Sequence, residues 1–213
     1  MIRRLVLWAG FLWGGLCLMS GAGWAAAHEA TPRPNFVLIL VDDAGLMDFG
    51  AYGGEAATPN IDRLATSGVM FTNYHTSPLC SPSRAMLLTG VDNHKTGVAT
   101  IPEVLPPAYR GRPGYSMHLE PGVVTVASRL KESGYRTYMT GKWHLSEGGE
   151  HLPDRHGFDR SFAMEVSGAD NWEQKSFMPY YNEAPWYEDG RPAQLPKDFY
   201  SSKFIVDQMI EYL

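Results

Sequence analysis

The sequence predicts an α/β fold in which helices cover a sheet. The first observation is the unbroken apolar run at residues 35–41, which is the pattern of a strand buried on both faces. The second is a strand, helix, strand order, with a helix expected from residue 58 and a short strand near residues 69–74. The third is that polar residues directly follow predicted strands, at the sheet edge where such folds gather ligands.

Local signals place the remaining helices. Thr58-Pro59-Asn60 suits a helix start and Gly68 a stop. Ser81 is expected to cap a second helix and Pro82 suits its first turn, which puts Cys80 at a helix N-terminus. Residues 123–133 read as a helix ended by Gly134, and residues 199–213 have helical spacing.

The segments between these helices contain one further strand and two long loops. Residues 135–140 are expected to form a strand that runs into Gly141-Lys142-Trp143-His144. Residues 91–121 are rich in Pro and Gly, and residues 146–198 have no regular pattern, so both are expected to be irregular.

Composition indicates a globular protein. The chain has 213 residues, of which 44% are hydrophobic, and this is enough for one ordinary domain core. The formal net charge of -5 is spread without long charged runs. The sequence therefore lacks the basic patch expected of a nucleic-acid-binding protein.

The first 27 residues have the pattern of a signal peptide. Arg3 and Arg4 precede an apolar stretch at residues 5–19, and the small residues 25–27 suit cleavage before His28. A membrane anchor is the alternative, and the Arg pair leaves twin-arginine export open beside the general secretory route. We expect an exported protein, periplasmic or secreted, without a stable membrane anchor.

A single cysteine remains after the predicted cleavage. Cys17 lies in the predicted signal, so Cys80 has no internal partner for a disulfide. The thiol of Cys80 must therefore be buried, joined to another chain, or used chemically.

The segment around Cys80 resembles the signature of the sulfatase family, within the alkaline phosphatase superfamily. Six positions of the family pattern are matched, and they are Cys80, Pro82, Arg84, Leu88, Thr89 and Gly90. The resemblance implies an α/β/α sandwich around a mixed, largely parallel sheet. It implies that residues 28–213 form the N-terminal part of a sulfatase catalytic domain.

The resemblance also implies a chemistry for Cys80. In the family, a maturation enzyme oxidises this cysteine to formylglycine, an aldehyde whose hydrate attacks the sulfur of a sulfate ester and later expels sulfate. Asp42 and Asp43 resemble the family's metal-binding pair and, with residue 80, would hold Ca²⁺ or Mg²⁺. Arg84 would hold the hydrated aldehyde or the metal-bound carboxylates in place. Capping of a turn is the alternative role for the two aspartates.

Further residues match the family beyond the signature. Lys142 would contact a sulfate oxygen, and His144 would hold or deprotonate the hydroxyl that drives sulfate release. Ser167 lies where some sulfatases offer a hydroxyl to the sulfate. Gly157-Phe158-Asp159 resembles a structural segment, and the aromatic residues between Trp172 and Tyr187 either rim a substrate pocket or pack a loop.

The metal site predicted from these residues is incomplete. Ca²⁺ takes roughly six to eight oxygen ligands, and the family's downstream Asp-Asn or Asp-Gln pair, Lys and His have no counterpart here. We therefore expect a partial catalytic domain. The sequence leaves open a phosphodiesterase or phosphonate monoester hydrolase of the same superfamily, and an inactive truncated fragment. It does not identify the sulfate ester, the metal or the oligomeric state.

Overall fold

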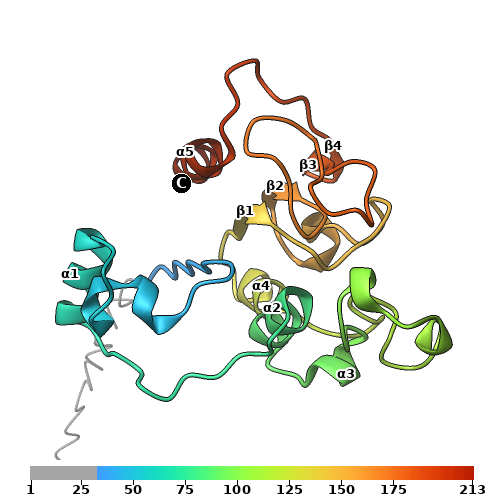
Figure 1. The fold of residues 1–213 in the computed structure, drawn as a ribbon, viewed down its shortest axis with the longest axis horizontal. Coiled ribbons are helices and arrows are strands. Elements are labelled where there is room, and N and C mark those ends of the chain that lie inside the picture. Colours follow the sequence, from blue (N-terminus) through green and yellow to red (C-terminus); the bar gives the residue numbers. More distant parts are fainter. Residues whose placement is uncertain (1–32) are drawn as a thin grey trace, which may run out of the picture. The chain divides into compact units, whose positions relative to one another are not determined.

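The computed structural model describes residues 33–213, so the predicted signal peptide at residues 1–27 lies outside it. The chain divides into two units, residues 1–40 and residues 41–213. Figure 1 shows the second unit, whose helices and strands are labelled. No helix in the described part of the chain is long and apolar enough to cross a membrane.

A four-stranded mixed sheet organises the second unit. Its strands follow the order β1-β2-β3-β4. β1 and β2 are parallel, whereas β3 is antiparallel to both β2 and β4. The strands are β1 (Tyr138–Lys142), β2 (Arg160–Met164), β3 (Trp186–Glu188) and β4 (Arg191–Pro192).

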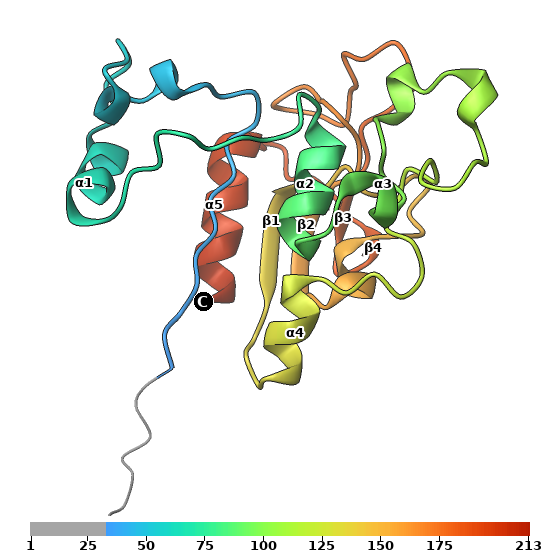
Figure 2. The same ribbon diagram turned by 90° about the horizontal axis from the view of Figure 1, so that it is seen from below.

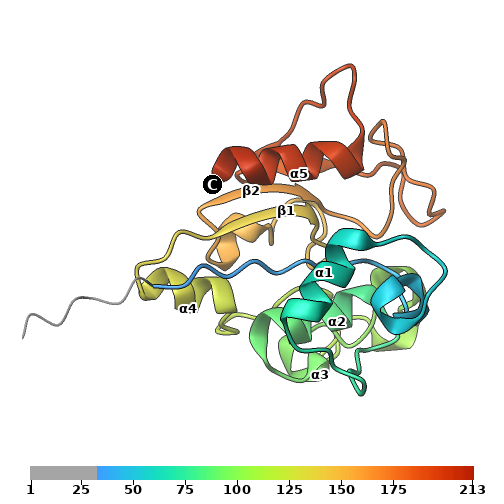
Figure 3. The ribbon, with the colours of Figure 1, turned by 90° about the vertical axis from the view of Figure 1, so that its left-hand side faces the viewer.

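Side chains that alternate along β2 give the sheet a helix layer on each face. Phe162 and Met164 belong to one core cluster, against which Phe204 of α5 (Ser201–Tyr212) packs. Ala163 points into a second cluster with Ala85 of α2 (Cys80–Thr89). Figures 2 and 3 show α5 on one side of β1 and β2, with α2 and α4 (Val126–Glu132) on the other. The α/β fold class predicted from the sequence is confirmed.

The predicted helices occur where their end signals are strongest. Thr58 precedes α1 (Pro59–Ser67), Pro59 is its first residue, and Gly68 ends it. The side chain of Thr125 accepts a hydrogen bond from the Ser128 amide at the start of α4. The remaining helical segments are short, namely α3 (Asn93–Thr96) and the 3₁₀ turns η1 (Leu46–Asp48), η2 (Gly50–Tyr52), η3 (Pro102–Val104), η4 (Pro107–Tyr109) and η5 (Pro153–His156).

Two predicted strands do not form. Residues 35–41 belong to no strand. Residues 69–74 also lie outside the sheet, and Val69 is 80% exposed. An apolar run predicts burial, but a strand also needs a neighbouring backbone with which to pair. Among the described residues, no strand supplies that pairing for either segment.

The opposite error occurs at residues 146–198, which contain β2, β3 and β4 although they were expected to be irregular. β3 and β4 are only three and two residues long, too short for a periodic pattern. They form through pairing: β3 pairs with β2, which is distant in the sequence, and β4 pairs with β3, directly before it in the chain. β1 also starts later than predicted and extends to Lys142.

Candidate active site

Cys80 is the first residue of α2, as its sequence context predicts. The predicted cap is wrong, because the N-cap residue is Leu79 and no side chain caps the helix. Ser81 is instead buried inside the first turn, and its hydroxyl has no hydrogen-bond partner among the described residues. The start of α2 thus leaves its first amide groups uncapped, and such a helix end favours an anion.

Asp42, Asp43 and Cys80 converge on one place although Asp43 and Cys80 are 37 positions apart in the chain. One ligand atom from each of the three lies within 4.8 Å of the others. Cys80 is a free, half-buried thiol, and both aspartates are exposed. Two carboxylates beside the residue 80 side chain form an oxygen-rich donor set that fits a hard divalent cation.

Arg84 holds this group of residues together from the next turn of α2. Its Nη2 lies 3.1 Å from Oδ1 of Asp42, and its Nη1 donates to the Lys142 carbonyl oxygen at 2.7 Å. The Arg84 side chain is only 11% exposed. A guanidinium suits this bridge because its donors point in fixed directions from one plane.

Lys142 completes the cationic side of the site at the end of β1. Its Nζ lies 2.6 Å from Oδ2 of Asp42, and its side chain is 10% exposed. Burial raises the pKa of the Asp42 carboxyl, but Lys142 and Arg84 outweigh that effect and hold the pKa below its ordinary value. Asp42 is therefore an anion at neutral pH, oriented by two cations before any metal binds.

His144 follows the end of β1 and lies deep in the protein. Its side chain is 1% exposed, and its backbone amide donates to the Glu165 carbonyl oxygen at 3.1 Å, which extends the β1–β2 pairing. Its Nε2 lies 3.3 Å from Oε1 of Glu103, whose side chain is 4% exposed. Burial lowers the pKa of His144, Glu103 raises it, and Lys142 and Arg84 lower it further, with a net decrease. The imidazole is neutral at neutral pH, the form that a general base requires.

Sequence reasoning missed Glu103, which lies in η3 within the loop at residues 91–121. Burial raises the pKa of this carboxyl, but His144, the backbone amide of Glu103 and Ser167 lower it to about 2. Ser167, a predicted substrate-binding residue, therefore lies beside Glu103. A lone acid in a Pro-rich loop gives no sequence signal, because its partner His144 is 41 residues away.

Two of the site residues have left-handed backbone conformations. Asp43 and His144 have φ angles of 56° and 54°, and only two other non-glycine residues in the described chain have positive φ angles. Such conformations cost of order 1–3 kcal/mol and persist where surrounding contacts enforce them. The cost is consistent with side chains that must point to a defined place.

Gly157-Phe158-Asp159 makes structural contacts. Phe158 packs edge-on against Trp143, with ring centroids 6.1 Å apart. The carboxylate of Asp159 accepts from the Thr137 amide at 3.0 Å and pairs with Lys131 at 2.8 Å. This segment therefore anchors the chain before β1 to the chain before β2.

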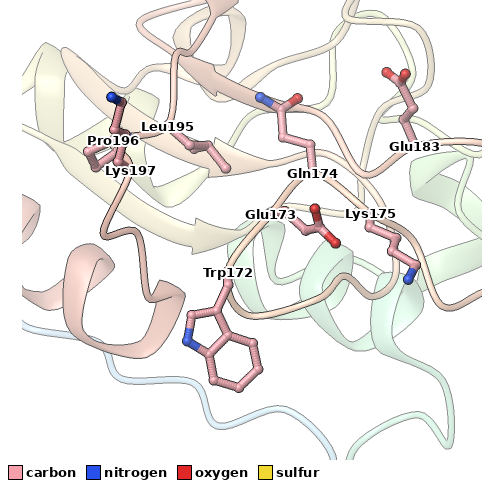
Figure 4. Close-up of a pocket in the computed structure, with 8 residues that line it drawn as sticks. All are labelled: Trp172, Glu173, Gln174, Lys175, Glu183, Leu195, Pro196 and Lys197. Carbon is pink, nitrogen blue, oxygen red and sulfur yellow. The ribbon is translucent and has the colours of Figure 1, made fainter.

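The aromatic residues between Trp172 and Tyr187 do not form a single cluster, because some are buried in the core and others are exposed. Trp186 is 3% exposed in the core, whereas Trp172 is 63% exposed and borders an open hollow of about 600 Å³ (Figure 4). The hollow is polar and contains none of the predicted site residues, since it is lined by Trp172, Glu173, Gln174, Lys175, Glu183, Leu195, Pro196 and Lys197.

Solved structures place the chain in the alkaline phosphatase-like α/β fold. The structure of Ps i-CgsB superposes with a TM-score of 0.69 at 26% identity, covering 84% of this chain and 41% of that protein. A protein solved in complex with its substrate D-glucosamine-2-N,6-O-disulfate gives a TM-score of 0.62 at 28% identity, covering 84% of this chain and 31% of that one.

Within that fold, the chain belongs to the sulfatase family, whose model, described as Sulfatase, matches residues 34–213. An arylsulfatase from Klebsiella aerogenes is 35% identical over 92% of this chain and 42% of its own length. Human arylsulfatase A is 44% identical over 71% of this chain and 28% of its own length. The chain thus spans less than half the length of these relatives.

Proposed function

We propose that the whole protein is a sulfuric ester hydrolase whose nucleophile is a formylglycine made from Cys80. The observation that carries this proposal is the meeting of Cys80, at the uncapped start of α2, with Asp42 and Asp43 within 4.8 Å. Membership of the sulfatase family supports it. One hydroxyl of the hydrated aldehyde attacks the sulfur of a sulfate ester and displaces the alcohol. The second hydroxyl then loses its proton, so that sulfate leaves and the aldehyde forms again.

Each nearby side chain has a role in this proposal. Asp42, Asp43 and residue 80 would hold Ca²⁺ or Mg²⁺, which lowers the cost of ionising the nucleophile and neutralises sulfate oxygens. Arg84 fixes the Asp42 carboxylate. Lys142, which pairs with the same carboxylate, supplies positive charge for a sulfate oxygen. Neutral His144 accepts the proton of the second hydroxyl of residue 80 during sulfate release.

The decisive experiment is mass spectrometry of the peptide that contains residue 80, after co-expression with a formylglycine-generating maturation enzyme. Conversion of cysteine to formylglycine is expected to lower the mass by about 18 Da, since CHO replaces CH₂–SH. Turnover of an aryl sulfate should then require the converted residue, and Cys80→Ala is the matched inactive variant. Full activity of a protein that retains an unmodified Cys80 would refute the proposal.

The same preparation separates this function from its alternatives. Faster turnover of a phosphodiester or a phosphonate monoester than of any sulfate ester would favour the other branch of the superfamily. We expect the 213-residue chain by itself to be inactive, because its described residues bring three ligand side chains together at this place, fewer than the roughly six to eight oxygen ligands that Ca²⁺ takes. We also propose that residues 1–27 direct export, which N-terminal sequencing of the mature protein tests.

A further inference from the structure

Glu103 is a buried carboxylate that the proposed reaction does not yet use. Its side chain is 4% exposed, and its carboxylate lies 3.3 Å from the neutral ring of His144. Taking a carboxylate out of water costs several kcal/mol unless partners compensate, so a buried acid of this kind needs an explanation. Among the described residues, no Lys or Arg forms an ion pair with Glu103.

The surroundings of Glu103 keep it ionised and in place. The flanking residues Ile101 and Leu105 are each 7% exposed and anchor the short η3 turn. Interactions with His144 and Ser167 lower the pKa of Glu103 to about 2 despite its burial. Burial and the neighbouring Glu103 raise the pKa of Tyr181, which places its protonated hydroxyl near the carboxylate. Neither oxygen of Glu103 makes a well-aligned hydrogen bond within the described residues.

His144, the residue that faces Glu103, also has buried polar atoms without a hydrogen-bond partner among the described residues. Both ring nitrogens are buried, and neither makes a well-aligned hydrogen bond within the described residues. Nε2 nevertheless lies 3.3 Å from the Glu103 carboxylate, and hydrogen bonds of catalytic groups are often long before substrate binds. An anionic carboxylate accepts and never donates, so this contact requires the hydrogen to be on Nε2. The lone pair is then on Nδ1.

We propose that Glu103 is a positioning residue that fixes the tautomer and orientation of His144, so that Nδ1 accepts the proton of the second hydroxyl of residue 80, whose loss expels sulfate. The arrangement repeats the logic by which a buried carboxylate orients a catalytic histidine in hydrolases. This inference rests on the proposed sulfatase activity. It assigns to a loop residue a role in the step that releases sulfate.

The test uses the whole protein, with 4-nitrophenyl sulfate as substrate and with kcat normalised to the formylglycine content of residue 80. Glu103→Gln keeps the shape but presents an amide that can donate to Nε2 and thereby favour the wrong tautomer. We expect kcat to fall about 100-fold, in the range seen for groups that orient a catalytic side chain. kcat/KM should stay within about threefold, because nitrophenolate leaves before sulfate does.

Two further variants distinguish positioning from a general structural role. Glu103→Asp keeps the charge and should recover about a tenth of the lost kcat or more, which also provides a readout if Glu103→Gln folds poorly. In a His144→Ala background, Glu103→Gln should cause no additional loss, because a residue that acts only through His144 has nothing left to act on. The exposed Glu132→Gln serves as the control and should match the wild type.

The outcomes separate the two proposals. A converted wild-type protein that fails to hydrolyse sulfate esters would refute the sulfatase function itself. If the wild type is active, a Glu103→Gln kcat within threefold of the wild-type value would overturn only the role of Glu103. The role of Glu103 would also be overturned if Glu103→Gln lowered kcat by the same factor in the wild-type and His144→Ala backgrounds. An equal fall in kcat and kcat/KM for Glu103→Gln would overturn it too.

Discussion

Arg84 offers a direct measurement of how much burial strengthens an ion pair in this protein. Within residues 33–213, two Arg–carboxylate pairs have the same N–O distance of 3.1 Å, namely Arg84–Asp42 and Arg129–Glu132. The Arg84 side chain is 11% exposed and that of Arg129 is 68% exposed. The two pairs therefore differ in environment and not in contact distance.

The expected costs follow from that difference. Removal of one partner from a buried pair costs about 3–5 kcal/mol, and the 39% exposure of Asp42 moves the estimate for Arg84→Met toward about 3 kcal/mol. The same substitution also leaves the Lys142 carbonyl without its donor. Arg129→Met removes an exposed i,i+3 pair and should cost about 0.3–0.5 kcal/mol.

Urea unfolding with a chelator present measures both variants without a contribution from bound metal. With an m-value of about 2 kcal/mol/M, the loss at Arg84 corresponds to a midpoint lower by about 1.5 M, and that at Arg129 to about 0.2 M. Equal midpoint shifts, or a loss below about 0.5 kcal/mol for Arg84→Met, would show that the buried bridge does not hold the site together.

Two further predictions concern stability. Gly157→Ala should lower the free energy of unfolding in urea by about 2 kcal/mol or more, because φ is 95° and the new Cβ would overlap the Ser128 backbone nitrogen. Gly122→Ala is the control and should cost less, because Gly122 also has a positive φ but its Cβ would meet open space. An equal cost at both glycines would argue against the overlap. Burial and His151 lower the pKa of His156 from 6.5 to about 4, so the unfolded chain binds the proton more tightly. Stability should fall by at most about 3 kcal/mol from pH 6.5 toward pH 4. His156→Gln should flatten this dependence and the exposed His75→Gln should not; an unchanged profile in His156→Gln would contradict the assignment.

Local patterns predicted the helices well and the strands poorly. Pro59 and Gly68 mark the ends of α1 because a helix is closed by hydrogen bonds between near neighbours in the chain. β3 and β4 carry no comparable signal, because their hydrogen bonds depend on partners brought in by the rest of the fold. The apolar run at residues 35–41 has the composition of a strand but forms none, because composition does not by itself supply a pairing partner.

The sequence alone determined the family, the position of Cys80 at the start of α2, and the candidate residues Asp42, Asp43, Arg84, Lys142 and His144. These follow from short motifs, whose spacing is fixed by covalent connection and by helix geometry. Only the tertiary structure decided that Asp42 is held by Arg84 and Lys142, and that Glu103 lies against His144. Those contacts join residues 41 to 100 positions apart, and contacts over that separation are set by packing of the core and not by any local pattern.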